Sequence, residues 1–128
     1  MKSISQVFYE LKKQKKRALI PYITAGDPDL ETTKRLIITI AQAGGDILEL
    51  GIPFSDPLAD GPTIQAASQR ALKSGTTLEA VMRLVKEVRK NVEMPIVLMS
   101  YYNPLWQYGI KKLAKEAKRV GVNGFIVP

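Results

Sequence analysis

Residues 46–50, Asp-Ile-Leu-Glu-Leu, narrow the possible folds more than any other part of this chain. A short, nearly continuous apolar run is typical of a strand in a parallel sheet that is covered by helices. Its internal charge is Glu49, which shares a strand face with Ile47, whereas Leu48 and Leu50 share the other face. Burying a carboxylate costs several kcal/mol unless a partner stabilises it, and no strand predicted below contains Lys or Arg. A functional role would explain an acid at this place.

The loop after this strand is rich in residues that interrupt regular structure: Gly51, Pro53, Pro57, Gly61 and Pro62. It also carries two further carboxylates, Asp56 and Asp60. The strand and its loop therefore bring three acids to one end of the sheet. Since the chain has no His and no Cys, its acid–base chemistry has to use carboxylates, Tyr or Lys.

Hydrophobic periodicity and helix-capping residues predict the remaining elements. The predicted strands are residues 18–23, 46–50, 95–100 and 124–127. The predicted helices begin at a Ser3/Gln6 capping box, at Asp29, at Pro62, at a Thr76/Glu79 capping box and near Ile110. This order, a helix and then β-α-β-αα-β-α-β, is the alternation of a parallel sheet with helical crossovers. Residues 44–48 and 121–125 both place Gly and then Asp or Asn before a strand, which favours a repeated βα unit.

The composition indicates one soluble domain, with 45% hydrophobic and 24% charged residues. No apolar run approaches the roughly 18 residues of a membrane span, and the basic start lacks the apolar core of a secretory signal. We therefore expect a cytoplasmic protein. The net charge of +7 arises mainly in residues 1–17, where six cations face one acid. Because this excess sits in predicted amphipathic helices and not on a basic face with aromatic or Gly-rich interleaving, nucleic-acid binding is not expected.

Three segments closely resemble the α subunit of tryptophan synthase: PYITAGDP at 21–28, LELGIPFSDPLADGPTIQ at 48–65 and YYNP at 101–104. The fold of that family is a (β/α)8 TIM barrel, which needs about 250 residues and eight strands. The resemblance therefore implies that residues 1–128 are a single domain, the amino-terminal half of a TIM barrel. This half-barrel would contain the first four β/α units and an N-terminal helix.

The resemblance also implies an activity. The family is a lyase of tryptophan biosynthesis, which cleaves indole-3-glycerol phosphate into indole and glyceraldehyde 3-phosphate by a retro-aldol step, without a metal or an organic cofactor. It works in an α2β2 heterotetramer with a β subunit, which holds pyridoxal phosphate and condenses the indole with serine. The groups that bind the substrate's phosphate belong to the second half of the family barrel. We therefore expect the 128-residue chain alone to be inactive.

By resemblance, Glu49 is the catalytic acid–base, which protonates the indole carbon and helps to move the proton of the glycerol hydroxyl. Asp60 is the carboxylate that faces the indole N–H and stabilises positive charge on the protonated ring. Their surroundings agree with this division, because an apolar strand favours a protonated carboxyl group and a polar loop favours an ionised one. Glu49 could instead be an ion-paired strand residue, and Asp60 could cap the helix that begins near Pro62.

The resemblance assigns four residues to the wall of the indole pocket: Tyr22, Ile64, Met99 and Tyr101. All but Ile64 could instead be plain core residues. At position 22 the family more usually has Phe. Two loop residues, Pro53 and Asp56, match residues that face the β subunit, although Asp before Pro is also a common turn former.

The alternative to a lyase is a non-catalytic half-barrel module that self-associates or binds the β subunit. Four strands cut from a closed barrel expose two sheet edges and an apolar interior. We therefore expect an isolated chain of this length to dimerise or to be poorly ordered.

Overall fold

The computed structural model describes residues 1–128 and contains one parallel sheet with the strand order β1-β2-β3-β4. The strands are β1 (Tyr22–Thr24), β2 (Leu48–Gly51), β3 (Ile96–Met99) and β4 (Gly124–Ile126). The helices are α1 (Ile4–Lys13), α2 (Leu30–Gln42), α3 (Pro62–Lys73), α4 (Leu78–Val88), α5 (Tyr102–Tyr108) and α6 (Ile110–Val120). The predicted alternation is confirmed, since each strand pairs in parallel with the next along the chain. None of the helices combines the length and the apolarity that crossing a membrane would need.

Most predicted helix starts are confirmed. Ser3 and Gln6 form the capping box of α1, the Asp29 carboxylate caps α2, and Pro62 is the first residue of α3. Helix α4 begins one residue later than predicted, because the hydroxyl that accepts a hydrogen bond from its first turn belongs to Thr77. Local capping chemistry therefore positions most of the helices.

The first strand and the fifth helix differ from the prediction. Strand β1 begins at Tyr22 and not at residue 18, because Pro21 has no N–H to contribute to the ladder. Helix α5 was not predicted. Its Pro104 lies in the first turn, where a missing N–H costs nothing, so the helix forms despite the proline.

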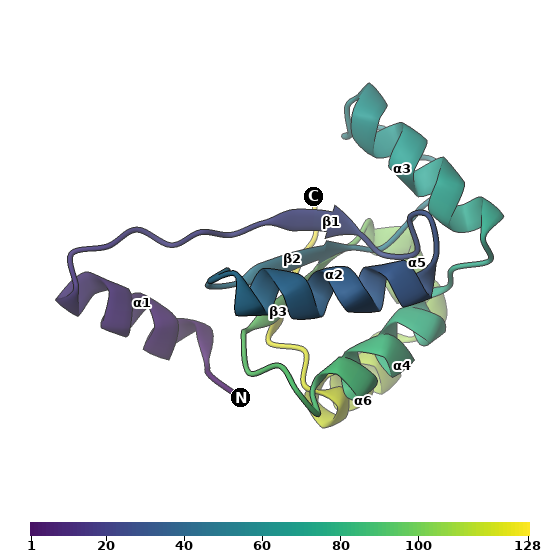
Figure 1. Ribbon diagram of the computed structural model, residues 1–128. Coiled ribbons are helices and arrows are strands. Elements are labelled where there is room, and N and C mark those ends of the chain that lie inside the picture. The colour runs from purple at the N-terminus through teal and green to yellow at the C-terminus, as the bar shows by residue number, and fades with distance from the viewer.

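The strand register gives the sheet two unlike faces. One face carries Leu48, Leu50, Ile96 and Leu98, which are fully buried against apolar residues of α2, α4 and α6. The other face, here called the open face, carries two rows of residues across the strands. The first row is Tyr22, Glu49, Val97 and Gly124, and the second is Thr24, Gly51, Met99 and Ile126. Glu49, Val97 and Met99 remain partly exposed, because the core helices gather on the opposite side (Figure 1).

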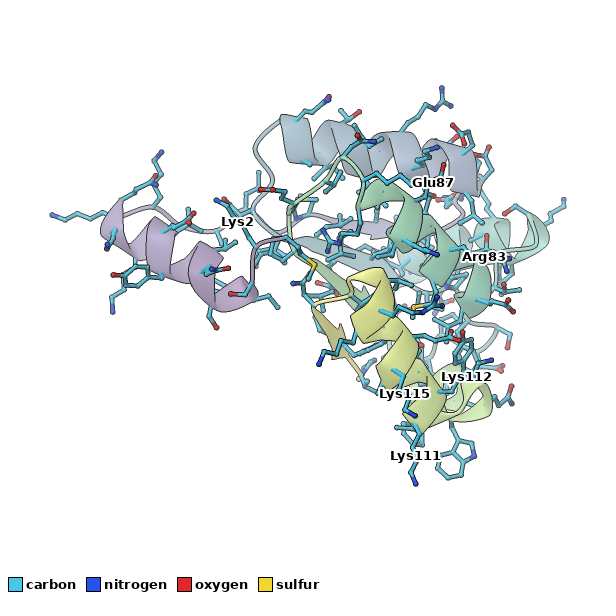
Figure 2. All side chains as sticks on the ribbon, turned by 90° about the horizontal axis from the view of Figure 1, so that it is seen from below. Lys2, Arg83, Glu87, Lys111, Lys112 and Lys115 are labelled. Atoms are coloured by element: carbon cyan, nitrogen blue, oxygen red, sulfur yellow. The ribbon has the colours of Figure 1, made fainter.

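Much of the positive charge lies on solvated helix surfaces. Lys111, Lys112 and Lys115 are exposed along α6 (Figure 2). Three other cations on the helices are paired with acids: Arg70, Arg83 and Lys34 of α2, whose ammonium lies 2.6 Å from the Glu87 carboxylate of α4. The two rows of residues on the open face contain no cation.

Arg89 joins α4 to the amino-terminal ends of β3 and β4. Its guanidinium donates to the carbonyl of Met94 at 2.6 Å, to that of Gly121 at 2.9 Å and to the side-chain oxygen of Asn123 at 2.8 Å. A further hydrogen bond goes to the carbonyl of Val92 at 3.1 Å. Burial lowers the pKa of Arg89 to about 10, which still leaves it charged at neutral pH. One cation thus satisfies four acceptors where the chain enters two strands.

Candidate active site

Glu49 lies in the middle strand pair, on the open face of the sheet. Its neighbours across the ladder are Tyr22 of β1 and Val97 of β3. Its carboxylate has no ion-pair partner among the four salt bridges of the chain, which removes the alternative of an ion-paired strand residue. The strand therefore holds a partly buried acid that is available to a ligand.

Asp60 is placed by the loop between β2 and α3. Its N–H donates to the Pro57 carbonyl at 3.0 Å, and its carbonyl accepts from the Gln65 side chain at 2.8 Å. The neighbouring N–H of Ala59 donates to the Tyr101 hydroxyl at 2.9 Å. The cap of α3 is Gly61, without any side-chain hydrogen bond, so the alternative that Asp60 caps this helix is wrong. Hydrogen bonds therefore fix the backbone of Asp60, while its carboxylate remains without a hydrogen-bond partner in the chain.

The phenol of Tyr22 is affected by the charges of both acids. Its ring lies over Gly51, and its hydroxyl is 3.3 Å from the hydroxyl of Thr24. Burial is the main cause that raises the pKa of Tyr22; the Thr24 hydrogen bond opposes it, and the charges of Asp60 and Glu49 add to it. Both carboxylates are thus close enough to the phenol to act on it. Glu49 is thus the ladder neighbour of Tyr22, and the charge of Asp60 also acts on this phenol.

The other residues predicted for the pocket surround the same end of the sheet. Met99 is the last residue of β3 on the open face, and Ile64 lies in the first turn of α3; both are partly buried. Tyr101 precedes α5, and its ring packs against Phe54 with centroids 5.3 Å apart. The sequence interpretation missed Phe54, although an aromatic residue among turn formers is a signal that could have indicated it.

The two residues assigned to a partner interface differ in exposure. Pro53 is buried within the chain, so its own side chain offers little surface to a partner. Asp56 is exposed and accepts a hydrogen bond from the Ser55 hydroxyl at 3.0 Å. Leu58, in the same loop and not singled out from the sequence, is 91% exposed. The loop therefore presents one acid and one large apolar side chain to the outside.

One cavity lies away from these groups. It measures about 620 Å³ and separates α1 from the amino-terminal ends of the strands. Charged side chains such as Lys2, Glu10 and Asp46 line it, whereas sites for aromatic ligands have mainly apolar walls. The charged lining of this cavity makes it a poor site for an aromatic ligand despite its volume, and the open face is the better candidate.

Parallel strands in sequential order with helical crossovers, and acids at the carboxyl-terminal end of a strand and in the loop after it, are features of the (β/α)8-barrel class, which builds its sites at this end of the strands. The sequence model of the family described as Tryptophan synthase alpha chain matches residues 8–128. This chain belongs to that family, and its four strands and six helices have the fold of a half TIM barrel with an N-terminal helix.

Individual relatives agree with the family match. The tryptophan synthase alpha chain of Geotalea uraniireducens (strain Rf4) is 52% identical over 127 residues, which are 99% of this chain and 48% of the relative. That of Thermoanaerobacter sp. (strain X514) is 51% identical over 128 residues, 100% of this chain and 49% of the relative. The crystal structure of tryptophan synthase subunit alpha from Legionella pneumophila str. Paris has a TM-score of 0.96 at 44% identity, over 99% of this chain and 49% of that one. The chain spans about half the length of the curated relatives it matches.

Proposed function

We propose that this chain supplies the acid–base half of a lyase site that cleaves indole-3-glycerol phosphate into indole and glyceraldehyde 3-phosphate, a step of tryptophan biosynthesis. The observation that supports the proposal is that Glu49 pairs with Tyr22 across the strand ladder, while the charge of Asp60 from the following loop acts on the same phenol. One acid stands on a strand and the other on a loop, and both are free of cations. Two carboxylates in unlike surroundings suit two different roles.

In the proposed reaction, the bond between indole C3 and the adjoining glycerol carbon breaks. Protonated Glu49 gives its proton to C3, which leaves positive charge on the ring nitrogen. The hydroxyl on the adjoining carbon then loses its proton to the Glu49 carboxylate and becomes the aldehyde oxygen, while the electrons of the broken bond return to the ring. Protons and electrons balance, so the chemistry requires no oxidant or reductant, and we propose that this chain binds no cofactor.

Asp60 acts in this scheme through its charge. An ionised carboxylate facing the indole N–H stabilises the positive charge that develops on the protonated ring. Its backbone is held by Pro57 and Gln65, so the carboxylate is placed before the substrate arrives. Tyr22, Ile64, Met99 and Tyr101 supply the aromatic and apolar surface against which a flat indole ring packs.

We further propose that residues 1–128 form one domain, the amino-terminal half of a barrel, and that the phosphate of the substrate is bound from outside these residues. Support comes from the extent of the match, which covers 48% of the Geotalea relative. On this proposal the 128-residue chain alone does not turn over the substrate.

The proposed partner is a β subunit that holds pyridoxal phosphate, in an α2β2 assembly in the cytoplasm. The loop between β2 and α3 is the proposed contact. Exposed Asp56 and the 91% exposed Leu58 are available there for such a contact. Pro53, which is buried, supports the loop from within.

The test joins residues 1–128 to the second half of the Geotalea relative and measures indole formation. Glu49→Gln is expected to lower the turnover by about 10²–10⁴-fold, the usual contribution of general acid–base catalysis. Asp60→Asn is expected to lower it by about 10²–10³-fold. Glu31→Gln, on the exposed side of α2, is the matched control and should leave turnover unchanged. Near-normal turnover after Glu49→Gln would refute the assigned role.

A further inference from the structure

The Tyr22 hydroxyl occupies a defined position at the mouth of the open face. Tyr22 is paired with Glu49, yet its ring leans two residues along the strands and covers Gly51. A methyl group on Gly51 would stand 2.1 Å from the phenol oxygen. The hydroxyl is therefore level with Thr24, Gly51 and Met99, in the last row of strand residues before the loops.

The hydroxyls of Tyr22 and Thr24 can together donate one hydrogen bond more than they make within the chain. The hydroxyls of Tyr22 and Thr24 carry two protons between them, and the single contact of 3.3 Å uses one. Neither hydroxyl makes a second hydrogen bond within the chain. Thr24 is 7% exposed, whereas Tyr22 faces the open side of the sheet. When Thr24 donates to the phenol oxygen, the phenol proton points to a ligand on the open face.

Among the substituents that an indole side chain can carry, a hydroxyl group suits both the phenol and the nearby acid. A hydroxyl can accept from Tyr22 and at the same time donate to the Glu49 carboxylate. A ligand carboxylate would be repelled by Glu49 and Asp60, and an alkyl group would leave the phenol without a partner. The raised pKa of Tyr22 keeps the phenol protonated at neutral pH.

We propose that Tyr22 is a specificity-determining residue, whose hydroxyl selects an indole with a hydroxylated side chain at C3 by donating to that hydroxyl beside Glu49. The proposal rests on the proposed lyase function and adds a residue to it. As the ligand hydroxyl loses its proton, its oxygen becomes a better acceptor, so the Tyr22 hydrogen bond strengthens along the reaction. A phenylalanine at this position would supply the ring without this selection.

The test compares two probes on the 128-residue chain by NMR titration: indole-3-glycerol, which carries the hydroxyls, and 3-propylindole, which does not. Tyr22→Phe is expected to weaken binding of indole-3-glycerol about three- to tenfold, as one hydrogen bond would, and to leave 3-propylindole unchanged. Tyr102→Phe, an exposed tyrosine on α5, is the control and should change neither.

The outcomes separate the two proposals. Equal binding of indole-3-glycerol to the wild-type chain and to Tyr22→Phe overturns the selection by Tyr22 and leaves the lyase function standing. Failure of the wild-type chain to bind either probe overturns the selection by Tyr22, because the open face would then not hold an indole; the lyase function is judged by the turnover of the joined chain.

Discussion

Replacing Gly51 by Ala tests the packing on which the site depends. The new methyl group would stand 2.1, 2.7 and 2.9 Å from three atoms at the end of the Tyr22 side chain, well inside van der Waals contact. The backbone at Gly51 does not have a positive φ, so Ala is not excluded there for conformational reasons. The ring of Tyr22 therefore has to turn away, and its contact with Thr24 is lost.

The expected cost follows from these two effects. A lost hydrogen bond contributes about 0.5–1.5 kcal/mol, and a side chain forced off its rotamer costs about 0.5–1.5 kcal/mol. Replacing Gly also stabilises the folded state by about 0.4–1 kcal/mol through the unfolded chain. The net loss in the free energy of unfolding for Gly51→Ala is therefore about 1 kcal/mol, at the lower end of the range for overpacking substitutions.

The assay is urea unfolding followed by far-UV circular dichroism, arranged as a double-mutant cycle. In a chain that already carries Tyr22→Leu, the ring is gone and Gly51→Ala should be neutral or slightly stabilising. The coupling energy then contains only the displaced ring and its lost hydrogen bond, about 1–3 kcal/mol. Gly124→Ala is the matched control, since it lies in the Glu49 row with nothing within 4 Å of its new methyl group. A coupling near zero, or equal effects of Gly51→Ala and Gly124→Ala, would refute the packing of Tyr22 over Gly51.

Three further predictions concern stability and association. Arg89→Met removes four hydrogen bonds and strands buried carbonyl groups, so the free energy of unfolding should fall by about 3–5 kcal/mol in urea titrations; a loss below about 1 kcal/mol contradicts the role of Arg89. The hydrogen-bonded Arg70 guanidinium, 2.8 Å from Asp27, holds the Asp27 pKa below its ordinary 3.8. The stabilisation by Asp27 is therefore present above pH 3.8 and is lost as the pH falls through the lowered pKa. The difference in the free energy of unfolding between wild type and Asp27→Asn should shrink in acid. A difference that does not change with pH argues against this ion pair. Because β1 and β4 both have an unpaired edge, light scattering should give a mass above the 14.2 kDa of one chain; a monodisperse monomer with cooperative melting contradicts self-association.

Local sequence signals predicted much of the fold. The capping residues Ser3 and Asp29 and the first-turn Pro62 each begin a helix, because capping depends on the chemistry of a few adjacent residues. The start of α4 was displaced by one residue, since Thr76 and Thr77 are both plausible caps and only the packed structure decides between them. Helix α5 was missed because a short helix with a proline gives no clear periodicity.

The site was predicted less completely than the fold. Sequence patterns singled out Glu49 and Asp60, because acids inside an apolar strand and beside prolines are unusual. They gave no indication that Gly51 is needed to make room for the Tyr22 ring, or that Tyr101 holds the loop at Ala59. Such contacts join positions on different strands, and a single sequence without its fold does not contain them.

The position of the site is tested most directly by methyl NMR on the four methionines of the chain. Met99 lies on the open face, Met94 lines the cavity beneath α1, and Met82 is buried in the core. On titration with indole-3-glycerol phosphate, we expect a saturable shift of the Met99 methyl resonance, while the Met94 and Met82 resonances stay unchanged. A shift of Met94 while Met99 stays unchanged would place binding at the cavity and contradict the assignment of the open face.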